Sequence, residues 1–302
     1  MLPQTETLRD EARGLDTRPG PEILALLLHG QQSALGAIQT CLPQIDAAAA
    51  LVAQALQTGG DIHYAAAGSS ALMGLADGVE LPGTFGIAPE RIHIHMAGGV
   101  PVTAAMPGHT EDDVHAAEKA ARGIKNGDVV IALSASGTTP YPIAFTRIAA
   151  ASGARIVAIA NNAGTPLLAQ ADCAIHLPTP PEVIAGSTRL GAATAQKAVL
   201  NMISTLMAMR LGHVHDGMMV NLIADNEKLR QRALGIVERI VPGAAPRQAL
   251  DLAGGHVKEA VLIAAGAVTR EQASALLNRT GGHLRPALAE LEKNTDQGRE
   301  KT

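Results

Sequence analysis

Hydrophobic positions change their spacing along the chain and divide it into three parts. Residues 21–58 carry two apolar patterns with helical spacing, and a Gly-Gly pair ends the second. The next part alternates short apolar runs with alanine-rich helical stretches. The short runs are five strand candidates, at 61–68, 91–98, 128–136, 154–161 and 173–178. Strands that alternate with helices predict an α/β fold, in which helices cover both faces of a parallel sheet.

The third part follows a Pro-Gly-Ala-Ala-Pro break at 242–246. Three short helical patterns lie beyond the break, and the tail after Leu291 is expected to fray. These patterns run at about 246–253, 256–265 and 270–279. We therefore expect three parts, an N-terminal arm with helices at 1–58, a ligand-binding domain at 59–241, and a small three-helix appendage with its tail at 242–302.

Composition limits the classes of partner. Hydrophobic residues make up 47% of the 302 residues and charged residues 17%, which is enough apolar material for a sizeable core. There is no Trp, and only two Tyr and two Phe, so a surface that stacks nucleic-acid bases is not expected. The net charge of −4 does not favour binding to nucleic acid or to anionic lipid.

Cysteine use and hydropathy indicate the compartment. Cys41 and Cys173 are too few and too far apart for a disulfide framework or a cysteine metal site. The start of the chain is polar and charged, and the apolar run near 198–211 is too short and too interrupted for a membrane span. We expect a soluble cytoplasmic protein.

Small hydroxyl residues follow two of the strand candidates. Gly68, Ser69 and Ser70 end the first strand and begin a helix, where N–H groups and hydroxyls would hold a phosphate or a sugar hydroxyl. A plain strand-to-helix turn gives the same pattern, so both interpretations stay open. After the third strand, four hydroxyls within six residues favour ligand binding. That loop contains Ser134, Ser136, Gly137, Thr138 and Thr139.

The stretch 181–228 combines a carboxylate, a polar turn and a long small-residue helix. Glu182 precedes a turn at Gly186, and Ser187, Thr188 and Arg189 supply donors for an anion. From about 192 to 211 the chain is apolar around most of a helical circumference. That pattern is typical of a helix buried in a core or in a subunit interface.

Taken whole, this stretch resembles the signature of the N-acetylmuramic acid 6-phosphate etherases, a branch of the sugar isomerase (SIS) domain superfamily. The segments AAGSSALMGLADGVELPGTFG and MAGGVPVTAAMPGHTED are similar to further family motifs, and the likeness covers about residues 5–289. The resemblance implies a parallel-sheet α/β/α sandwich of SIS type. It also implies a homodimer in which one subunit completes the site of the other.

The resemblance also implies an activity. Family members cleave the D-lactyl ether of N-acetylmuramic acid 6-phosphate to N-acetylglucosamine 6-phosphate and D-lactate, without a metal or redox cofactor. Matching the motifs puts the two catalytic carboxylates on Glu80 and Glu111. Our hypothesis is that Glu111 removes the C2 proton and Glu80 protonates the leaving ether oxygen. The residues alone do not separate these roles, and Glu111 also suits the cap of a helix.

Several positions that are cationic in the family are not cationic here. Such positions correspond to Leu72, Thr138, Gly191 and Asp61. His213, His215 and Asn221 depart from the pattern as well. Either the hydroxyl loops and helix N-termini hold the phosphate without those cations, or the substrate is a related, less anionic sugar. The same residues would also suit a sugar-phosphate isomerase or a non-catalytic sugar-phosphate-binding regulator.

Eleven histidines raise the question of a metal. His93 and His95 alternate on one strand candidate and point to the same face. With no acid or cysteine at clear ligand spacing beside them, we expect no metal site. Polar strand ends or a subunit contact account for them instead.

Overall fold

Contacts between residues divide the chain into two compact units. The structure is a computed structural model that describes residues 3–106, 108–224 and 226–299. One unit comprises Met1–Glu80 and Pro89–Leu206, and the other comprises Leu81–Ala88 and Met207–Thr302. The bounds of the three domains expected from the sequence stay a prediction.

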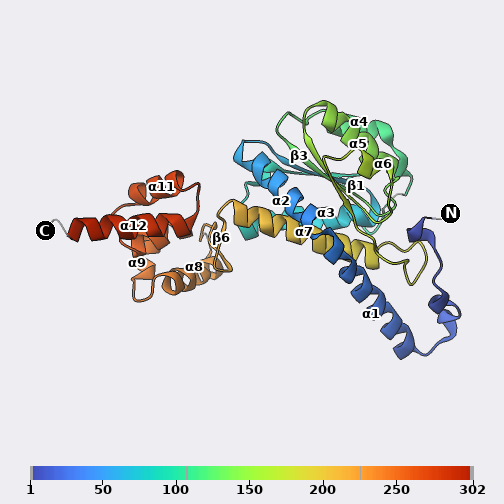
Figure 1. The fold of residues 1–302 in the computed structure, drawn as a ribbon, viewed down its shortest axis with the longest axis horizontal. Helices are drawn as coiled ribbons and strands as arrows, with labels where there is room; N and C mark the ends of the chain where they lie inside the picture. Colours follow the sequence, from blue (N-terminus) through green and yellow to red (C-terminus); the bar gives the residue numbers. More distant parts are fainter. Residues whose placement is uncertain (1–2, 107, 225, 300–302) are drawn as a thin grey trace. The chain divides into compact units, whose positions relative to one another are not determined.

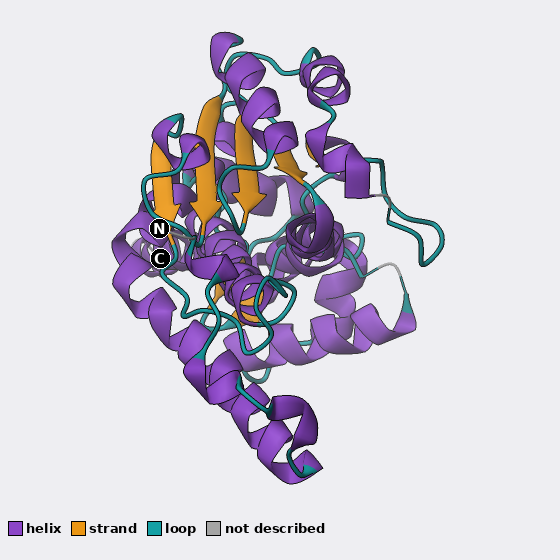
Figure 2. Cartoon of the chain, turned by 90° about the vertical axis from the view of Figure 1, so that its right-hand side faces the viewer, coloured by secondary structure: helices purple, strands orange, loops and turns teal. Residues whose placement is uncertain are grey.

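A five-stranded parallel sheet forms the centre of the first unit, and all five predicted strands are confirmed (Figures 1 and 2). The spatial order is β2-β1-β3-β4-β5. Every residue of β1 and β3 is buried, as expected for strands covered on both faces. The strands are β1 (Ile62–Ala66), β2 (Ile92–Met96), β3 (Val129–Ser134), β4 (Arg155–Ala160) and β5 (Cys173–His176).

Helices cover both faces of the sheet, as the alternating pattern predicts (Figure 1). One face is covered by α4 (Val114–Ala121), α5 (Pro140–Ala151) and α6 (Pro166–Ala169). The other face is covered by α2 (Leu42–Gln57), α3 (Gly68–Phe85) and α7 (Gly191–Arg210). Short 3-10 helices η5 (Pro89–Arg91) and η6 (Gly108–Asp112) precede β2 and α4.

A buried carboxylate ties α3, β1 and α7 together. Asp77 accepts hydrogen bonds from Tyr64 at 2.7 Å, from Asn201 at 2.8 Å and from Ser204 at 3.0 Å. Gly78 lies over the ring of Tyr64, and a β-carbon at Gly78 would be 3.2 Å from that ring. These contacts hold α3 close against the sheet, and α3 begins at the carboxyl end of β1.

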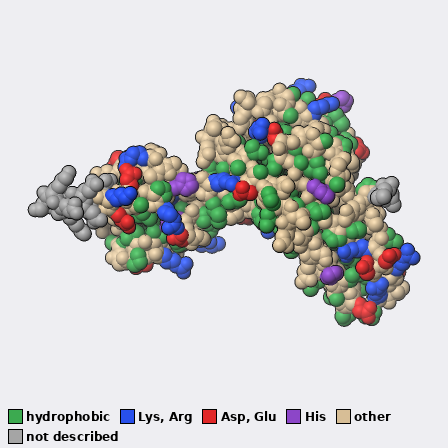
Figure 3. Space-filling view, viewed as in Figure 1, with side chains coloured by type: hydrophobic (Ala, Val, Ile, Leu, Met, Phe, Trp, Pro, Cys, Tyr) green, Lys and Arg blue, Asp and Glu red, His purple; other side chains and the backbone are tan. Residues whose placement is uncertain are grey.

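The N-terminal region holds two helices, as predicted from residues 21–58. Three 3-10 turns, η1 (Gln4–Glu6), η2 (Asp10–Ala12) and η3 (Leu15–Thr17), lead into α1 (Gly20–Gly36), and η4 (Ala37–Cys41) joins α1 to α2. In Figure 3, charged side chains of both signs gather over α1 and the segment before it, at the lower right. This agrees with the charged arm expected from the sequence.

One stretch, Gly20–Gln57, is long and apolar enough to cross a membrane by length and composition alone. Its mean hydropathy is 1.3, and 33% of its most apolar part is buried. Core helices of soluble proteins pass the same test, and α2 packs on β1, β3 and β5 with Ala48 and Ala49 fully buried. The sequence-based prediction considered only the apolar run near 198–211 as a possible membrane span, and it did not consider Gly20–Gln57.

The second unit is helical. A short hairpin, β6 (Val214–His215) with β7 (Met218–Met219), precedes α8 (Glu227–Ile240). The three predicted helices are confirmed as α9 (Pro246–Leu252), α10 (Val257–Ala264) and α11 (Arg270–Arg279). A further helix, α12 (Leu284–Arg299), occupies the tail that was expected to fray. Leu284 and Ala287 of α12 are buried in the core of this unit, and that burial anchors the helix.

Candidate functional site

The turn that ends β1 brings the backbone of Gly68 to the start of α3. Gly68 has φ +54°, a left-handed conformation that glycine adopts without the strain of a side chain. Ser69 is half-buried and Ser70 is buried, in the first turn of the helix. The N–H groups at a helix N-terminus favour an anion, which is the chemistry expected for these three residues. That they bind a ligand stays a prediction.

The loop after β3 gathers its hydroxyls around one point. Ser134 Oγ lies 2.8 Å from Thr139 Oγ1 and 3.2 Å from Ser136 Oγ, and it accepts a hydrogen bond from the N–H of Gly137 at 3.0 Å. Thr138 donates from its hydroxyl to Ser136 at 3.1 Å. Because β1 and β3 are paired neighbours, this loop and the Gly68 turn emerge at the same edge of the sheet.

Glu111 lies against the Gly68 turn. Its Oε1 is 2.8 Å from the position that a β-carbon on Gly68 would occupy. The pocket that both residues line has a volume of about 50 Å³ and is closed by the turn after β2, including Gly98 and Gly99. Burial, and then the neighbouring charge of Asp112, raise the pKa of Glu111.

The alternative role of Glu111 as a helix cap is not what the structure shows. Asp113 is the N-cap of α4, and its carboxylate accepts a hydrogen bond from the N–H of Ala116 at 2.8 Å. Glu111 belongs to η6, one turn earlier. Its carboxylate is therefore available to the pocket.

The N-terminal arm links two of the candidate loops, a role that sequence reasoning missed. The amide of Asn162, at the end of β4, donates to the carbonyl of Ser136 and to the hydroxyl of Thr5, each at 3.2 Å. The carbonyl of Thr5 accepts a hydrogen bond from the N–H of Gly186 at 3.0 Å. A buried position for a threonine in a charged arm gave no signal in the sequence.

The turn before α7 holds the remaining predicted residues. Ser187 and Thr188 are half-buried, and Arg189 is exposed. The carboxylate of Glu182 is buried, and its two oxygens accept hydrogen bonds from the N–H groups of Gly191 at 2.9 Å and Ala192 at 2.8 Å. Glu182 therefore caps α7, and a contact of Glu182 with a substrate stays a prediction.

Glu80 lies away from this edge of the sheet within one chain. It is exposed on α3, twelve residues beyond Gly68 in the same helix, which is about 18 Å along the axis. Since Glu111 is beside Gly68, the structure does not bring the two predicted catalytic carboxylates together in one chain.

One group of side chains has the spacing of metal ligands among the described residues. Asp61, His63 and His93 have ligand atoms that all lie within 4.8 Å of one another. The expectation that no acid lies beside the strand histidines is therefore wrong, because Asp61 directly precedes the neighbouring strand β1. This group is at the amino ends of β1 and β2, and the hydroxyl loops are at the carboxyl ends.

Comparison with known proteins identifies the family. The model for the SIS domain matches residues 104–208. The chain is 39% identical over 294 residues to the N-acetylmuramic acid 6-phosphate etherase of Deinococcus radiodurans, covering 96% of each chain. It is 40% identical over 291 residues to the protein of the same name from Streptomyces avermitilis, covering 94% of this chain and 93% of that one.

A solved structure shows the same fold. A Bacteroides fragilis protein, whose description names a phosphosugar isomerase involved in capsule formation, aligns with a TM-score of 0.51 at 16% identity. The alignment covers 66% of this chain and 95% of that one. The fold is the α/β/α sandwich of SIS type, as predicted. From its similarity to the curated relatives over nearly the whole length, this chain belongs to the N-acetylmuramic acid 6-phosphate etherase family.

Proposed function

We propose that this protein is a carbon–oxygen lyase that cleaves the D-lactyl ether of N-acetylmuramic acid 6-phosphate. The products are N-acetylglucosamine 6-phosphate and D-lactate. Membership of the etherase family supports the reaction. The main structural support for the proposed active site is the position of Glu111. Its carboxylate is half-buried against the glycine turn at the start of α3.

The reaction needs a base and an acid, and we assign them to Glu111 and Glu80. With the sugar ring open, the C1 aldehyde makes the C2 proton acidic, and Glu111 removes it. The resulting enolate expels lactate from C3, and Glu80 protonates the departing oxygen. Water then adds at C3 and a proton returns to C2, so the net change is hydrolysis of the ether. Glu80, deprotonated after lactate leaves, takes a proton from the water that adds, and Glu111 returns its proton to C2. The reaction as proposed uses no metal or redox cofactor.

The phosphate is proposed to lie between the two hydroxyl-rich turns. N–H groups at the start of α3, with Ser69 and Ser70, would contact it from one side. The other side would be formed by the loop that follows β3. That loop comprises Ser134, Ser136, Gly137, Thr138 and Thr139. Ser187, Thr188 and Arg189 are proposed to contact the remainder of the sugar.

Glu80 is proposed to act in the site of a second subunit. Ala76, Val79 and Glu80 are exposed and spaced three and four residues apart, so they share one face of α3. Val79 is 60% exposed, which is unusual for a valine in a helix interior. Pairing of that face in a homodimer would cover Val79 and carry Glu80 to the partner's Glu111.

We place the enzyme in the cytoplasm, in the recycling of cell-wall amino sugars. The proposed substrate is a phosphorylated sugar that carries the lactyl group of muramic acid. Its charges keep it from crossing a membrane unaided.

The activity test is release of D-lactate from N-acetylmuramic acid 6-phosphate, with exchange of the C2 proton followed in deuterated water. We expect Glu111→Gln to lose exchange of the C2 proton. Its turnover should fall by about 10²- to 10⁴-fold. Glu80→Gln should release lactate slowly while keeping exchange. Glu90→Gln, an exposed carboxylate of the same unit, is the control. Wild-type exchange in Glu111→Gln would contradict the assignment.

Mixing the two inactive variants tests the shared site. If each site takes Glu111 from one subunit and Glu80 from the other, subunit exchange between Glu80→Gln and Glu111→Gln restores about a quarter of wild-type activity. Half of the dimers are then hybrids, and each hybrid has one complete site. If both carboxylates act within one chain, mixing restores nothing, and the dimeric site is wrong.

The missing cations favour one second candidate, an etherase for a less anionic sugar. Thr138 is exposed in the hydroxyl loop after β3, at a position where the resemblance to the family leads us to expect arginine. Comparing turnover of phosphorylated and unphosphorylated muramic acid decides between the two. Equal or faster turnover without phosphate would favour the less anionic sugar.

A further inference from the structure

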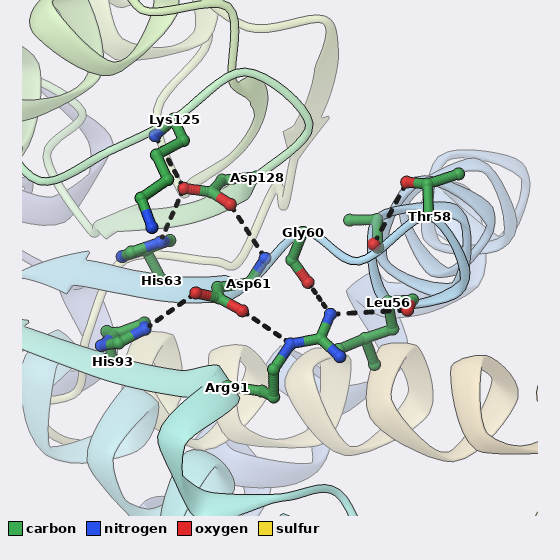
Figure 4. Close-up of polar contacts among 10 residues, drawn as sticks. Leu56, Thr58, Gly60, Asp61, His63, Arg91, His93, Lys125 and Asp128 are labelled. Atoms are coloured by element: carbon green, nitrogen blue, oxygen red, sulfur yellow. Dashed lines mark hydrogen bonds and ion pairs between the residues drawn. The ribbon is translucent and has the colours of Figure 1, made fainter.

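The amino ends of β1 and β2 carry polar side chains that the proposed reaction does not use. The two strands are parallel, and His63 is in register with His93. Alternation along each strand then puts Asp61 and His63 on the same face of the sheet as His93 and His95. Figure 4 shows Asp61, His63 and His93 directed toward one another, with Asp128 beside them. Four side chains with metal-binding atoms thus meet at the amino ends of β2, β1 and β3.

The separations suit a tetrahedral ion. Asp61 Oδ2 is 3.4 Å from His93 Nε2, and His63 Nε2 is 3.3 Å from Asp128 Oδ2. Ligands about 2.1 Å from a zinc ion in a tetrahedron lie about 3.4 Å from one another. The ligand atoms of Asp61, His63 and His93 all lie within 4.8 Å of one another. A small rotation of the side chains would bring these atoms to the separations that a tetrahedral ion needs.

The buried Nε2 of His63 points into this group, where its polar neighbour is the carboxylate of Asp128. The side chain of His63 is only 6% exposed, and its Nε2 lies near Asp128 but outside hydrogen-bond geometry. A buried polar atom whose hydrogen bond is poorly formed destabilises the fold. A bound cation would satisfy that atom.

The surrounding contacts orient the three ligands. His63 Nδ1 is 3.0 Å from His95 Nε2, so His63 can donate its hydrogen there and leave the Nε2 lone pair for an ion. A metal-binding histidine is usually held in this way through its other nitrogen. Arg91 donates to Asp61 Oδ1 at 2.6 Å, which leaves Oδ2 facing His93.

We propose that Asp61, His63 and His93 bind a divalent transition-metal ion, with Asp128 or water as a fourth ligand. Two imidazoles and a carboxylate suit Zn²⁺, and Co²⁺ takes the same tetrahedral geometry. The ion ties edge strand β2 to β1 at the end of the sheet opposite the hydroxyl loops. It is a structural ion and takes no part in ether cleavage.

The same contacts also describe a site without a metal. If the hydrogen lies on His95 Nε2, it is donated to His63 Nδ1, and His63 Nε2–H then faces Asp128. That arrangement is a relay of neutral imidazoles ending on a carboxylate. It predicts no stoichiometric metal binding, so a binding measurement separates the two.

The test uses the full-length chain without an affinity tag, treated with chelator and then freed of it. Zn²⁺ is titrated calorimetrically, the bound metal is counted by mass spectrometry, and Co²⁺ is added separately to record its visible spectrum. We expect one ion per chain, a tetrahedral Co²⁺ spectrum and a higher unfolding temperature with Zn²⁺. Wild-type protein that takes up no stoichiometric ion would overturn the proposal.

Variants localise the site. His93→Ala should abolish stoichiometric binding, and because this side chain is 39% exposed, its loss should leave the metal-free fold intact. Asp61→Asn is a second ligand variant, and His95→Ala should weaken binding by about 10- to 100-fold. His115→Ala, with a side chain 98% exposed on α4, is the matched control. Binding that survives both ligand variants, or that is lost in the control, would overturn the assignment.

Discussion

The two ends of strands β1 and β2 carry opposite kinds of chemistry. At the carboxyl ends, the candidate site is made of glycine turns, neutral hydroxyls and helix N-termini, with Glu111 as its half-buried carboxylate. At the amino ends, charged and titratable side chains pack against one another, with Asp61 between Arg91 and His93. A single pair of neighbouring strands therefore presents backbone dipoles at one end and fixed side-chain charges at the other.

Departures from the family pattern fall at both ends, and they differ in kind. By resemblance to the family pattern, Thr138 of the hydroxyl loop stands where an arginine is expected, so a positive charge is missing at the carboxyl ends of the strands, here called the ligand end. By the same resemblance, Asp61 stands where an arginine is expected at the amino end, and its carboxylate pairs there with Arg91. The ligand end should therefore depend on backbone geometry, whereas changes at the amino end should alter stability and leave turnover alone.

The largest effect is expected from one methyl group at the ligand end. In Gly68→Ala, the new β-carbon would lie 2.8 Å from Glu111 Oε1, so the carboxylate must move. A displacement of about 1 Å of a catalytic group can cost about 100-fold in rate. We expect kcat/KM for lactate release to fall by about that factor. Steady-state kinetics at saturating and limiting substrate measure it.

A second glycine with positive φ serves as the control that separates the contact with Glu111 from the backbone strain of an alanine at positive φ. Gly59 also has positive φ, +90°, and a β-carbon there meets nothing within 4 Å. Gly59→Ala and Gly68→Ala should each lose about 1 kcal/mol of stability. Only Gly59→Ala should keep full activity. Equal activity in both variants would show that the approach of Glu111 to the turn does not matter.

At the amino end, the expected effect is on stability and pH. Burial is the main cause that lowers the pKa of His63 and of His95 to about 4, from an ordinary 6.5. Between those values the unfolded chain binds protons that the folded chain does not, so stability falls as pH drops from about 6.5 to 4. A pKa lowered from 6.5 to about 4 corresponds to about 3 kcal/mol for one ring, so we expect the pair to contribute several kcal/mol to that fall. Denaturant unfolding across this range, in the presence of chelator, measures it.

The variant His95→Gln tests the assignment, since it removes one of the two titrating rings. The fall in stability should shrink relative to wild type, while lactate release at neutral pH stays unchanged. His213, whose pKa is also lowered to about 4 by burial, contributes in both proteins and cancels in the comparison. A fall as steep as that of wild type would mean that the cluster does not titrate as described.

Periodicity predicted the fold well because burial on both faces leaves a strong pattern in β1, β3 and β4. The hydroxyl loop after β3 could also be recognised, since its four hydroxyls are adjacent in sequence. Contacts between segments that are far apart could not. The bridge from Thr5 through Asn162 to Ser136 depends on tertiary packing, and so does the register that sets Asp61 and His63 beside His93. Local spacing also could not show that α3 carries Glu80 away from Glu111.

The smallest expected effect restores one cation to the ligand end. In Thr138→Arg, a guanidinium enters the exposed rim of the hydroxyl loop, where a charge-assisted hydrogen bond to phosphate is worth about 1.5–3 kcal/mol. Part of that energy is lost to ordering the side chain, so we expect KM for the 6-phosphate to fall by about tenfold. Unphosphorylated muramic acid is the internal control, and its KM should not change. A similar fall in KM for both sugars would mean that the phosphate binds away from Thr138. A rise in KM for the phosphorylated sugar alone would mean that the loop binds the phosphate better without the added charge.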